Sequence, residues 1–131
     1  MRHNRIFQRR GYRLKPLRVL LRNVTRTAKE WGFPFAMRIQ PDFLQNYTLP
    51  HICDDEGFYL VGQLTLIIDG VLQGLLPHKP VSYGKYLAFD FTLAAQHRRR
   101  NTVEIVELGV VIGPCDGRRP VVYVWRIEPL A

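Results

Sequence analysis

The order of apolar and polar residues divides the chain into a short helical segment and a longer body with the two-residue period of β-strands. Between Pro16 and Trp31, apolar residues recur three or four positions apart, which gathers them on one side of a helix. Pro16 suits the first helical position, and Gly32 suits a helix end. The spacing therefore predicts an amphipathic helix over 16–32, whose apolar stripe packs on the body: Leu17, Leu20, Leu21, Val24, Ala28 and Trp31.

After this helix the pattern predicts a strand, a loop and a hairpin. Residues 33–39 alternate between apolar and polar side chains, as a half-buried strand does. Residues 40–57 contain two prolines and an acidic cluster, and we expect an irregular loop there. The run FYLVGQLTLII at 58–68 predicts a long strand, and Asp69-Gly70 signals a tight hairpin turn before a second strand at 71–76.

Three further strands are predicted in the carboxyl-terminal half, at 85–94, 102–112 and 121–127. In the first of them, Leu87, Phe89, Phe91 and Leu93 alternate with Tyr86, Ala88, Asp90 and Thr92, so that one face is strongly apolar. Tight turns between successive strands indicate an antiparallel sheet. The sequence thus predicts a mainly β domain over 33–131, an antiparallel β-sandwich or small barrel of about six strands with one helix before it.

Part of this pattern resembles a known class of domains. The pattern over about 63–108 resembles immunoglobulin-like β-sandwich accessory domains. The resemblance is carried by the strand ending in Asp69-Gly70, by Phe89-Asp90-Phe91 and by Asn101-Thr102-Val103-Glu104-Ile105. In such domains the residue before the asparagine is often glycine, where this chain has Arg100. The resemblance implies a sandwich and a non-catalytic role, and it carries no site residues.

Charge sets the first 29 residues apart from the rest. They hold ten of the 19 basic residues and no acidic residue, which leaves nine basic residues against all 11 acidic ones in the remainder. Such asymmetry indicates a polyanionic partner: nucleic acid, an anionic membrane surface or an acidic protein. Residues 1–15 show no apolar period, so we expect a basic extended arm there. The basic residues are Arg2, Arg5, Arg9, Arg10, Arg13, Lys15, Arg18, Arg22, Arg26 and Lys29.

The arm has the composition of a segment that contacts RNA or single strands, because Phe7 and Tyr12 interleave with its arginines. A solvated tail, or an arm that wraps a neighbouring subunit, has the same composition. Arg98, Arg99 and Arg100 form a second basic feature and complete the candidate nucleic-acid-binding residues. Arg118 and Arg119 follow in the next turn, about 30 Å away if the strand between is straight. Arginines in turns can also serve solubility alone.

No motif of an enzyme is present, and we expect neither catalysis, nor a cofactor, nor a small-molecule substrate. Ser82 lacks the first glycine of a nucleophile elbow, and carboxylates beside Cys53 disfavour its thiolate. The segment 51–56, HICDDE, could be half of a zinc site, but no second cluster of similar spacing follows. Its carboxylates are expected to be solvated, or to receive the basic arm of the same or another copy.

We expect an intracellular protein, cytoplasmic or within an assembled particle, with no membrane span. No apolar run approaches the roughly 18 residues that a spanning helix needs, and the N-terminus lacks the apolar core of a secretory signal. Mitochondrial import is disfavoured because transit peptides are rich in serine, and Ser82 is the only serine. Cys53 and Cys115 are expected to be free, buried thiols.

Two hypotheses about function follow. The preferred one is a structural or adaptor subunit of a larger assembly, a ribonucleoprotein or a virion, anchored to RNA or other nucleic acid through its arm by non-specific contacts to phosphate. The alternative is a β-sandwich module that binds protein or carbohydrate, with an arm that wraps a neighbouring subunit. In that case the loop 76–84 would carry recognition, and Tyr83 or Trp125 could be contact aromatics, although the place of Trp125 in a strand favours the core.

Overall fold

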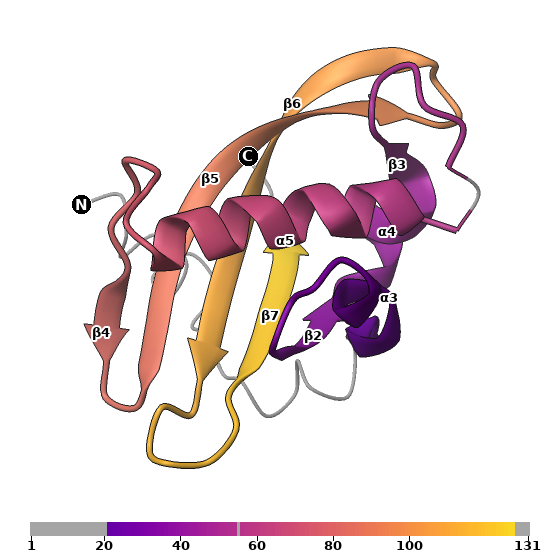
Figure 1. Ribbon diagram of the computed structural model, residues 1–131. Helices are drawn as coiled ribbons and strands as arrows, with labels where there is room; N and C mark the ends of the chain where they lie inside the picture. Colours follow the sequence, from indigo (N-terminus) through magenta and orange to yellow (C-terminus); the bar gives the residue numbers. More distant parts are fainter. Residues whose placement is uncertain (1–20, 55, 128–131) are drawn as a thin grey trace.

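The computed structural model describes residues 21–54 and 56–127, which form a curled β-sheet with a long helix on its concave side (Figure 1). The arm predicted over 1–15 and the first residues of the predicted helix lie outside this part of the chain. In chain order the elements are β1 (Arg22–Asn23), α3 (Thr25–Glu30), β2 (Ala36–Ile39), α4 (Pro41–Asn46), β3 (Tyr47–Thr48), α5 (Phe58–Leu72), β4 (Val81–Tyr83), β5 (Tyr86–His97), β6 (Thr102–Gly113) and β7 (Val121–Arg126).

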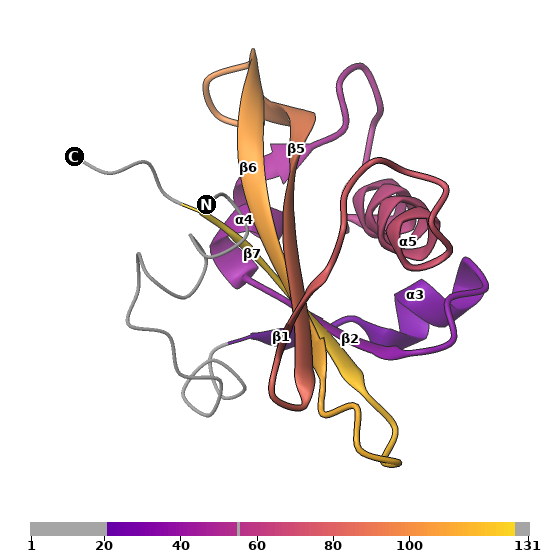
Figure 2. The same cartoon turned by 90° about the vertical axis from the view of Figure 1, so that its left-hand side faces the viewer.

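The sheet has seven strands in the order β1-β2-β7-β6-β5-β3, and β4 pairs with the other end of β5. All neighbours are antiparallel except β2 and β7, which run parallel with Ala36 opposite Val121. Figure 2 shows α5 and α3 on the same side of the sheet. The mainly β prediction is confirmed, but the described residues form one curled sheet and not the two sheets of a sandwich.

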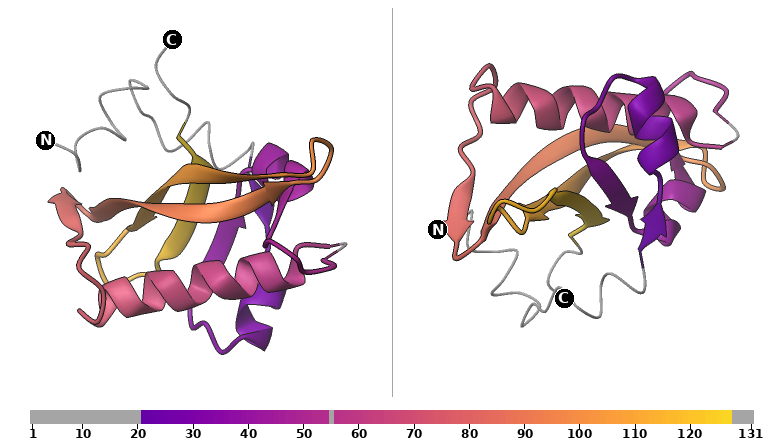
Figure 3. Two further views of the ribbon diagram at one scale, coloured as in Figure 1. Left: turned by 90° about the horizontal axis from the view of Figure 1, so that it is seen from above. Right: turned by 60° about the horizontal axis from the view of Figure 1, so that its bottom comes forward.

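The predicted hairpin at 58–76 is wrong, because this segment forms the helix α5 (Figure 3). The buried positions Leu60, Leu64, Ile68 and Val71 recur at helical spacing. Only Gln63, Thr65 and Asp69 interrupt the apolar residues, so the pattern does not distinguish a strand from a buried helix, and the 15 residues fit a helix better than a strand. The segment that opens the resemblance to immunoglobulin-like domains is therefore helical in this chain.

The predicted amphipathic helix is also corrected. Within the described part it comprises only α3, and the preceding residues form β1, which pairs with β2. The reason is local hydrogen bonding: the backbone N–H of Val24 donates to the Met37 carbonyl, and the side chain of Asn23 accepts from both the N–H and the hydroxyl of Thr25. The Asn23 contacts turn the chain into α3 without a continuous helix. Gly32, with a φ of 82°, follows the helix end as predicted.

The segment 40–57, predicted to be a loop, contains α4 and β3. Pro41 stands at the start of α4, where a proline is well tolerated, so the missed helix had a recognisable signal. The strands predicted at 33–39, 85–94, 102–112 and 121–127 are confirmed as β2, β5, β6 and β7, with shifted ends.

Two apolar clusters lie on opposite faces of the sheet. The larger joins α5 to the concave face and includes Phe89 and Phe91, as the alternation predicted. The smaller, on the other face, includes Tyr123 and Trp125. Trp125 is only 3% exposed, so it is a core residue, and the suggestion that it contacts a ligand is not supported.

Gly62 brings α3 and α5 into close contact, and this contact gives a testable prediction. A Cβ at Gly62 would overlap the indole ring of Trp31, whose Nε1 donates to the Phe58 carbonyl at 3.0 Å. We expect Gly62→Ala to lower the free energy of unfolding by about 1 kcal/mol or more, although alanine favours helices by about 1 kcal/mol. With Trp31→Ala present, the same substitution should stabilise the protein. Urea unfolding of the wild type, the two single variants and the double variant measures these changes in the free energy of unfolding. If Gly62→Ala stabilised the protein both with and without Trp31, the close contact would be contradicted.

Candidate nucleic-acid interface

Six of the thirteen candidate nucleic-acid-binding residues lie in the described part of the chain: Arg22, Arg26, Lys29, Arg98, Arg99 and Arg100. The other seven lie outside it: Arg2, Arg5, Arg9, Arg10, Arg13, Lys15 and Arg18. The six occupy two regions of the fold. One region is α3, which carries Arg26 and Lys29, and the other is the turn between β5 and β6 (Figure 1), beside which Arg22 of β1 lines one hollow with Arg98.

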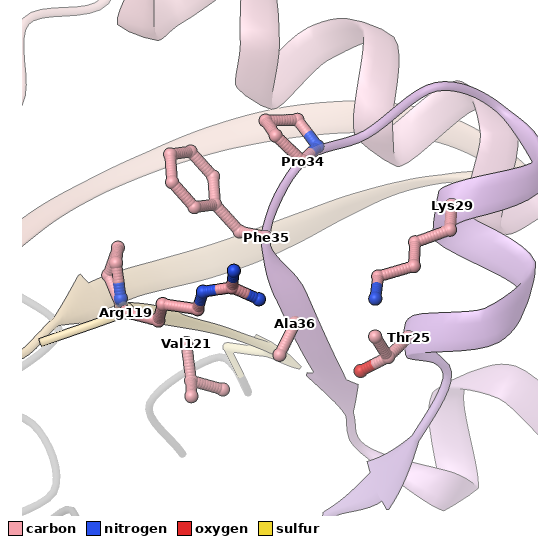
Figure 4. Close-up of a pocket in the computed structure, with 8 residues that line it drawn as sticks. Thr25, Lys29, Pro34, Phe35, Ala36, Arg119 and Val121 are labelled. Atoms are coloured by element: carbon pink, nitrogen blue, oxygen red, sulfur yellow. The ribbon is translucent and has the colours of Figure 1, made fainter.

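A cleft of about 450 Å³ lies between α3 and the end of the loop that precedes β7. Figure 4 shows Lys29 and Arg119 reaching toward the start of β2 from opposite sides, with the ring of Phe35 above. The cleft exists because β2 and β7 are parallel neighbours that begin side by side. Its lining residues are Thr25, Lys29, Pro34, Phe35, Ala36, Arg119, Pro120 and Val121.

Hydrogen bonds from Thr25 position the helix that carries Lys29. The Thr25 hydroxyl donates to Asn23 Oδ1 at 2.6 Å and accepts from the Met37 N–H at 3.0 Å. These contacts fix the first residue of α3 to β2. They also use the hydroxyl, so Thr25 contributes little hydrogen-bonding capacity to a ligand in the cleft.

The loop between β6 and β7 is braced by one carboxylate. Asp116 accepts from the Arg118 guanidinium at 2.6 Å and lies 3.4 Å from the Lys85 ammonium. The hydrogen bond from Arg118 holds the pKa of Asp116 well below its usual range. Asp116 therefore pairs with Arg118 and Lys85 but not with Arg119.

Lys29 and Arg119 are exposed, and neither forms an ion pair with a carboxylate of residues 21–54 or 56–127. Their two positive charges face one cleft whose remaining walls are largely apolar. Such a site attracts an anion, and the guanidinium fork and the ammonium both bind phosphate oxygens well. The sequence named Lys29 as a candidate residue and Arg119 only as part of a separate basic turn, because nothing in it signalled that β2 lies beside β7.

A second, smaller hollow of about 200 Å³ brings Arg22 together with Arg98. Leu44, Gln45 and Glu56 complete its lining, so an acidic side chain stands among the basic ones. Arg98 Nη2 also donates to the backbone carbonyl of Asp54. Arg98 thus ties the β5–β6 turn to the segment before α5, and part of its hydrogen-bonding capacity is already used.

The three arginines of this turn are not equivalent. Arg100 donates twice to Glu104, at 3.2 and 2.8 Å, and the hydrogen bond from Arg100 lowers the pKa of the Glu104 carboxyl. Tyr47 donates to the same carboxylate, and burial raises the pKa of Tyr47. Arg99 is exposed, and its guanidinium makes no ion pair with a carboxylate of the described chain. Arg99 is therefore the arginine of the turn that is available to a phosphate.

Asp54, in the acidic segment 51–56, has a role in the fold. Asp54 is buried, and its carboxylate accepts from the N–H groups of Tyr59 and Leu60 at 3.3 and 3.0 Å, in the first turn of α5. Within residues 21–54 and 56–127, no three His, Cys, Asp or Glu side chains gather as a metal site would require. Cys53 and Cys115 are free as predicted, but they are exposed and not buried.

Comparison of the chain with protein-family models, with curated proteins and with solved structures finds no match. The resemblance to immunoglobulin-like domains stays a prediction. Within the described part of the chain, no helix combines the length and the apolar character needed to cross a bilayer.

Proposed function

We propose that this protein is a non-catalytic structural or adaptor subunit of a larger assembly inside the cell, a ribonucleoprotein or a virion, anchored to nucleic acid through its basic residues. The observation that carries the proposal is the convergence of Lys29 and Arg119, far apart in sequence, on one cleft without a carboxylate partner among the described residues. The ten basic and no acidic residues of the first 29 add to it.

Binding of this kind depends on contacts between basic side chains and the phosphates of the nucleic acid. Lysine and arginine side chains neutralise phosphate charges and release bound counterions, so affinity falls steeply as salt rises, and sequence readout is weak. The curled sheet and α5 supply a stable body that other subunits can contact, while the basic residues hold that body on the nucleic acid.

The test is the binding of labelled oligonucleotides to the purified full chain, measured by fluorescence anisotropy over a salt series. For six or more phosphate contacts, we expect the affinity to fall by about 10³-fold or more between about 50 and 200 mM salt, with little dependence on sequence. The ultraviolet spectrum of the freshly purified protein, before and after nuclease, should show co-purified nucleic acid. An affinity that is insensitive to salt, or no binding at low salt, would refute the proposal.

A further inference from the structure

We infer that the cleft between α3 and the β6–β7 loop holds one unpaired nucleotide, with its phosphate between Lys29 and Arg119 and its base or ribose against Phe35. This inference rests on the proposed function and adds a ligand class to it. The protein should prefer single strands to duplexes, because one of its sites accepts a nucleotide only when the base is free.

The charge of the cleft selects an anion. Lys29 and Arg119 bring two cations to one cleft, and Asp116 forms its ion pairs with Arg118 and Lys85 instead. Because the Thr25 hydroxyl is already hydrogen-bonded on both sides, the side chains offered to a ligand are donors that carry positive charge. A phosphate diester, with its charged oxygens, fits two such donors on opposite sides.

The apolar walls indicate that the anion belongs to a larger group. Phe35 is half-buried and packs edge to face on Phe33, at 5.7 Å between ring centroids and 80° between ring planes. Its ring and Pro34 line the cleft (Figure 4), and Pro120 is a further lining residue. A free inorganic ion would leave these surfaces in water, whereas a nucleobase or ribose would cover them. Contact between bases and aromatic side chains is largely independent of sequence.

The size and the borders of the cleft favour an unpaired nucleotide. Its volume of about 450 Å³ lies in the range of roughly 300–1,000 Å³ that is usual for small-molecule sites. A base in a duplex is stacked and paired, and it reaches such a cleft only after leaving the stack, which costs free energy. A base in a single strand has a much smaller cost. The structure is also prepared for the ligand, since hydrogen bonds fix α3 and Asp116 braces the loop.

The experiment compares affinities of the full chain for a fluorescein-labelled single-stranded RNA of about 12 nucleotides, for the same RNA in a duplex, and for a single strand of equal length with abasic sites. The variants are Lys29→Gln with Arg119→Gln, and Phe35→Leu. The control for loss of charge outside the cleft is Lys79→Gln, which removes one positive charge from an exposed residue, and Lys29→Gln alone is the variant that matches it in charge. Thermal unfolding verifies that all variants fold. Uridine monophosphate and inorganic phosphate, titrated by calorimetry, serve as small probes.

We expect the wild-type chain to prefer the single strand to both other nucleic acids by roughly fivefold or more, the effect of about one stacked base. The preference should disappear in the double variant. Phe35→Leu should weaken binding of the normal single strand but not of the abasic strand, and Lys79→Gln should keep the preference.

The outcomes separate the inference from the proposed function. Salt-dependent binding without a preference for single strands, or with a preference that the double variant keeps, overturns the inference alone. A third outcome is that the oligonucleotides do not bind, whereas uridine monophosphate binds the wild-type chain but not the double variant. In that case the proposed function is refuted, and the cleft is still a nucleotide-binding site. Binding of inorganic phosphate as tightly as uridine monophosphate overturns the role of Phe35, and absence of all binding overturns both.

Discussion

Replacing Leu64 by alanine is expected to lower the free energy of unfolding by about 2–5 kcal/mol, whereas Leu66→Ala should lower it by less than about 0.5 kcal/mol. Leu64 is fully buried between α5 and the sheet, and Leu66, two positions along, is 62% exposed. Truncation of Leu64 removes apolar contacts and leaves a cavity, but truncation of Leu66 removes a side chain that lies mostly in water. Urea unfolding followed by circular dichroism measures both losses.

This pair of variants also tests whether residues 58–72 form a helix. In a strand, Leu64, Leu66 and Ile68 would point to the same face, and their truncation would cost similar amounts. In the helix α5, Ile68 joins Leu64 in the core because it lies one turn further on. Ile68→Ala is therefore the positive control and should resemble Leu64→Ala. A loss at Leu66 as large as that at Leu64 would contradict the helix.

The mistaken strand at 58–68 shows what the sequence pattern can resolve. Where polar residues interrupt the apolar ones at a fixed interval, as in β5, the period is visible, and the strand and its core face were predicted correctly. In α5 nearly every position is apolar, so neither period stands out, and the Asp69-Gly70 pair then favoured a hairpin that does not form. A helix buried against a curled sheet does not need a polar face as wide as that of a surface helix.

The candidate site was predictable only in part, because it depends on strand order. The basic character of Lys29 and Arg119 is evident in the sequence, but their proximity follows from the parallel pairing of β2 with β7, across some eighty residues of intervening chain. Short turns between strands favour a sheet in which each strand pairs with the next one in the chain. Such a sheet would place the segments that carry Lys29 and Arg119 far apart. The sequence likewise could not reveal that Asp116 pairs with Arg118 and leaves Arg119 to the cleft.

Removal of Met1–Lys15 is expected to weaken the binding of single-stranded nucleic acid by about a hundredfold or more near physiological salt. The segment contains six of the 19 basic residues and no acidic residue. Each lost phosphate contact makes the plot of log affinity against log salt shallower by about 0.7 for single strands, so the slope should change by up to about 4. Anisotropy titrations of the full and truncated chains at several salt concentrations give both quantities.

Two further variants of the full chain show whether the charge or the residue order of Met1–Lys15 is responsible for its contribution to affinity. Replacing the six basic residues of Met1–Lys15 by glutamine should reproduce the effect of the deletion, because charge is lost while length is kept. Shuffling the order of residues 2–15 should leave affinity within a few-fold, since contacts to phosphate do not depend on order. The proposal would be refuted if the truncated chain kept full affinity at high salt, or if the shuffled chain lost it.

The truncated chain also shows whether the affinity for nucleic acid and the preference for single strands come from different parts of the protein. Lys29, Phe35 and Arg119 remain in it, so its weaker binding should still favour single strands over duplexes. The double variant of the cleft keeps the arm, so it should bind nucleic acid more tightly than the truncated chain but without the preference for single strands. The two effects should combine almost independently, because residues that share no partner have nearly additive free energies. A truncated chain that binds single strands and duplexes equally would mean that the arm, and not the cleft, distinguishes them.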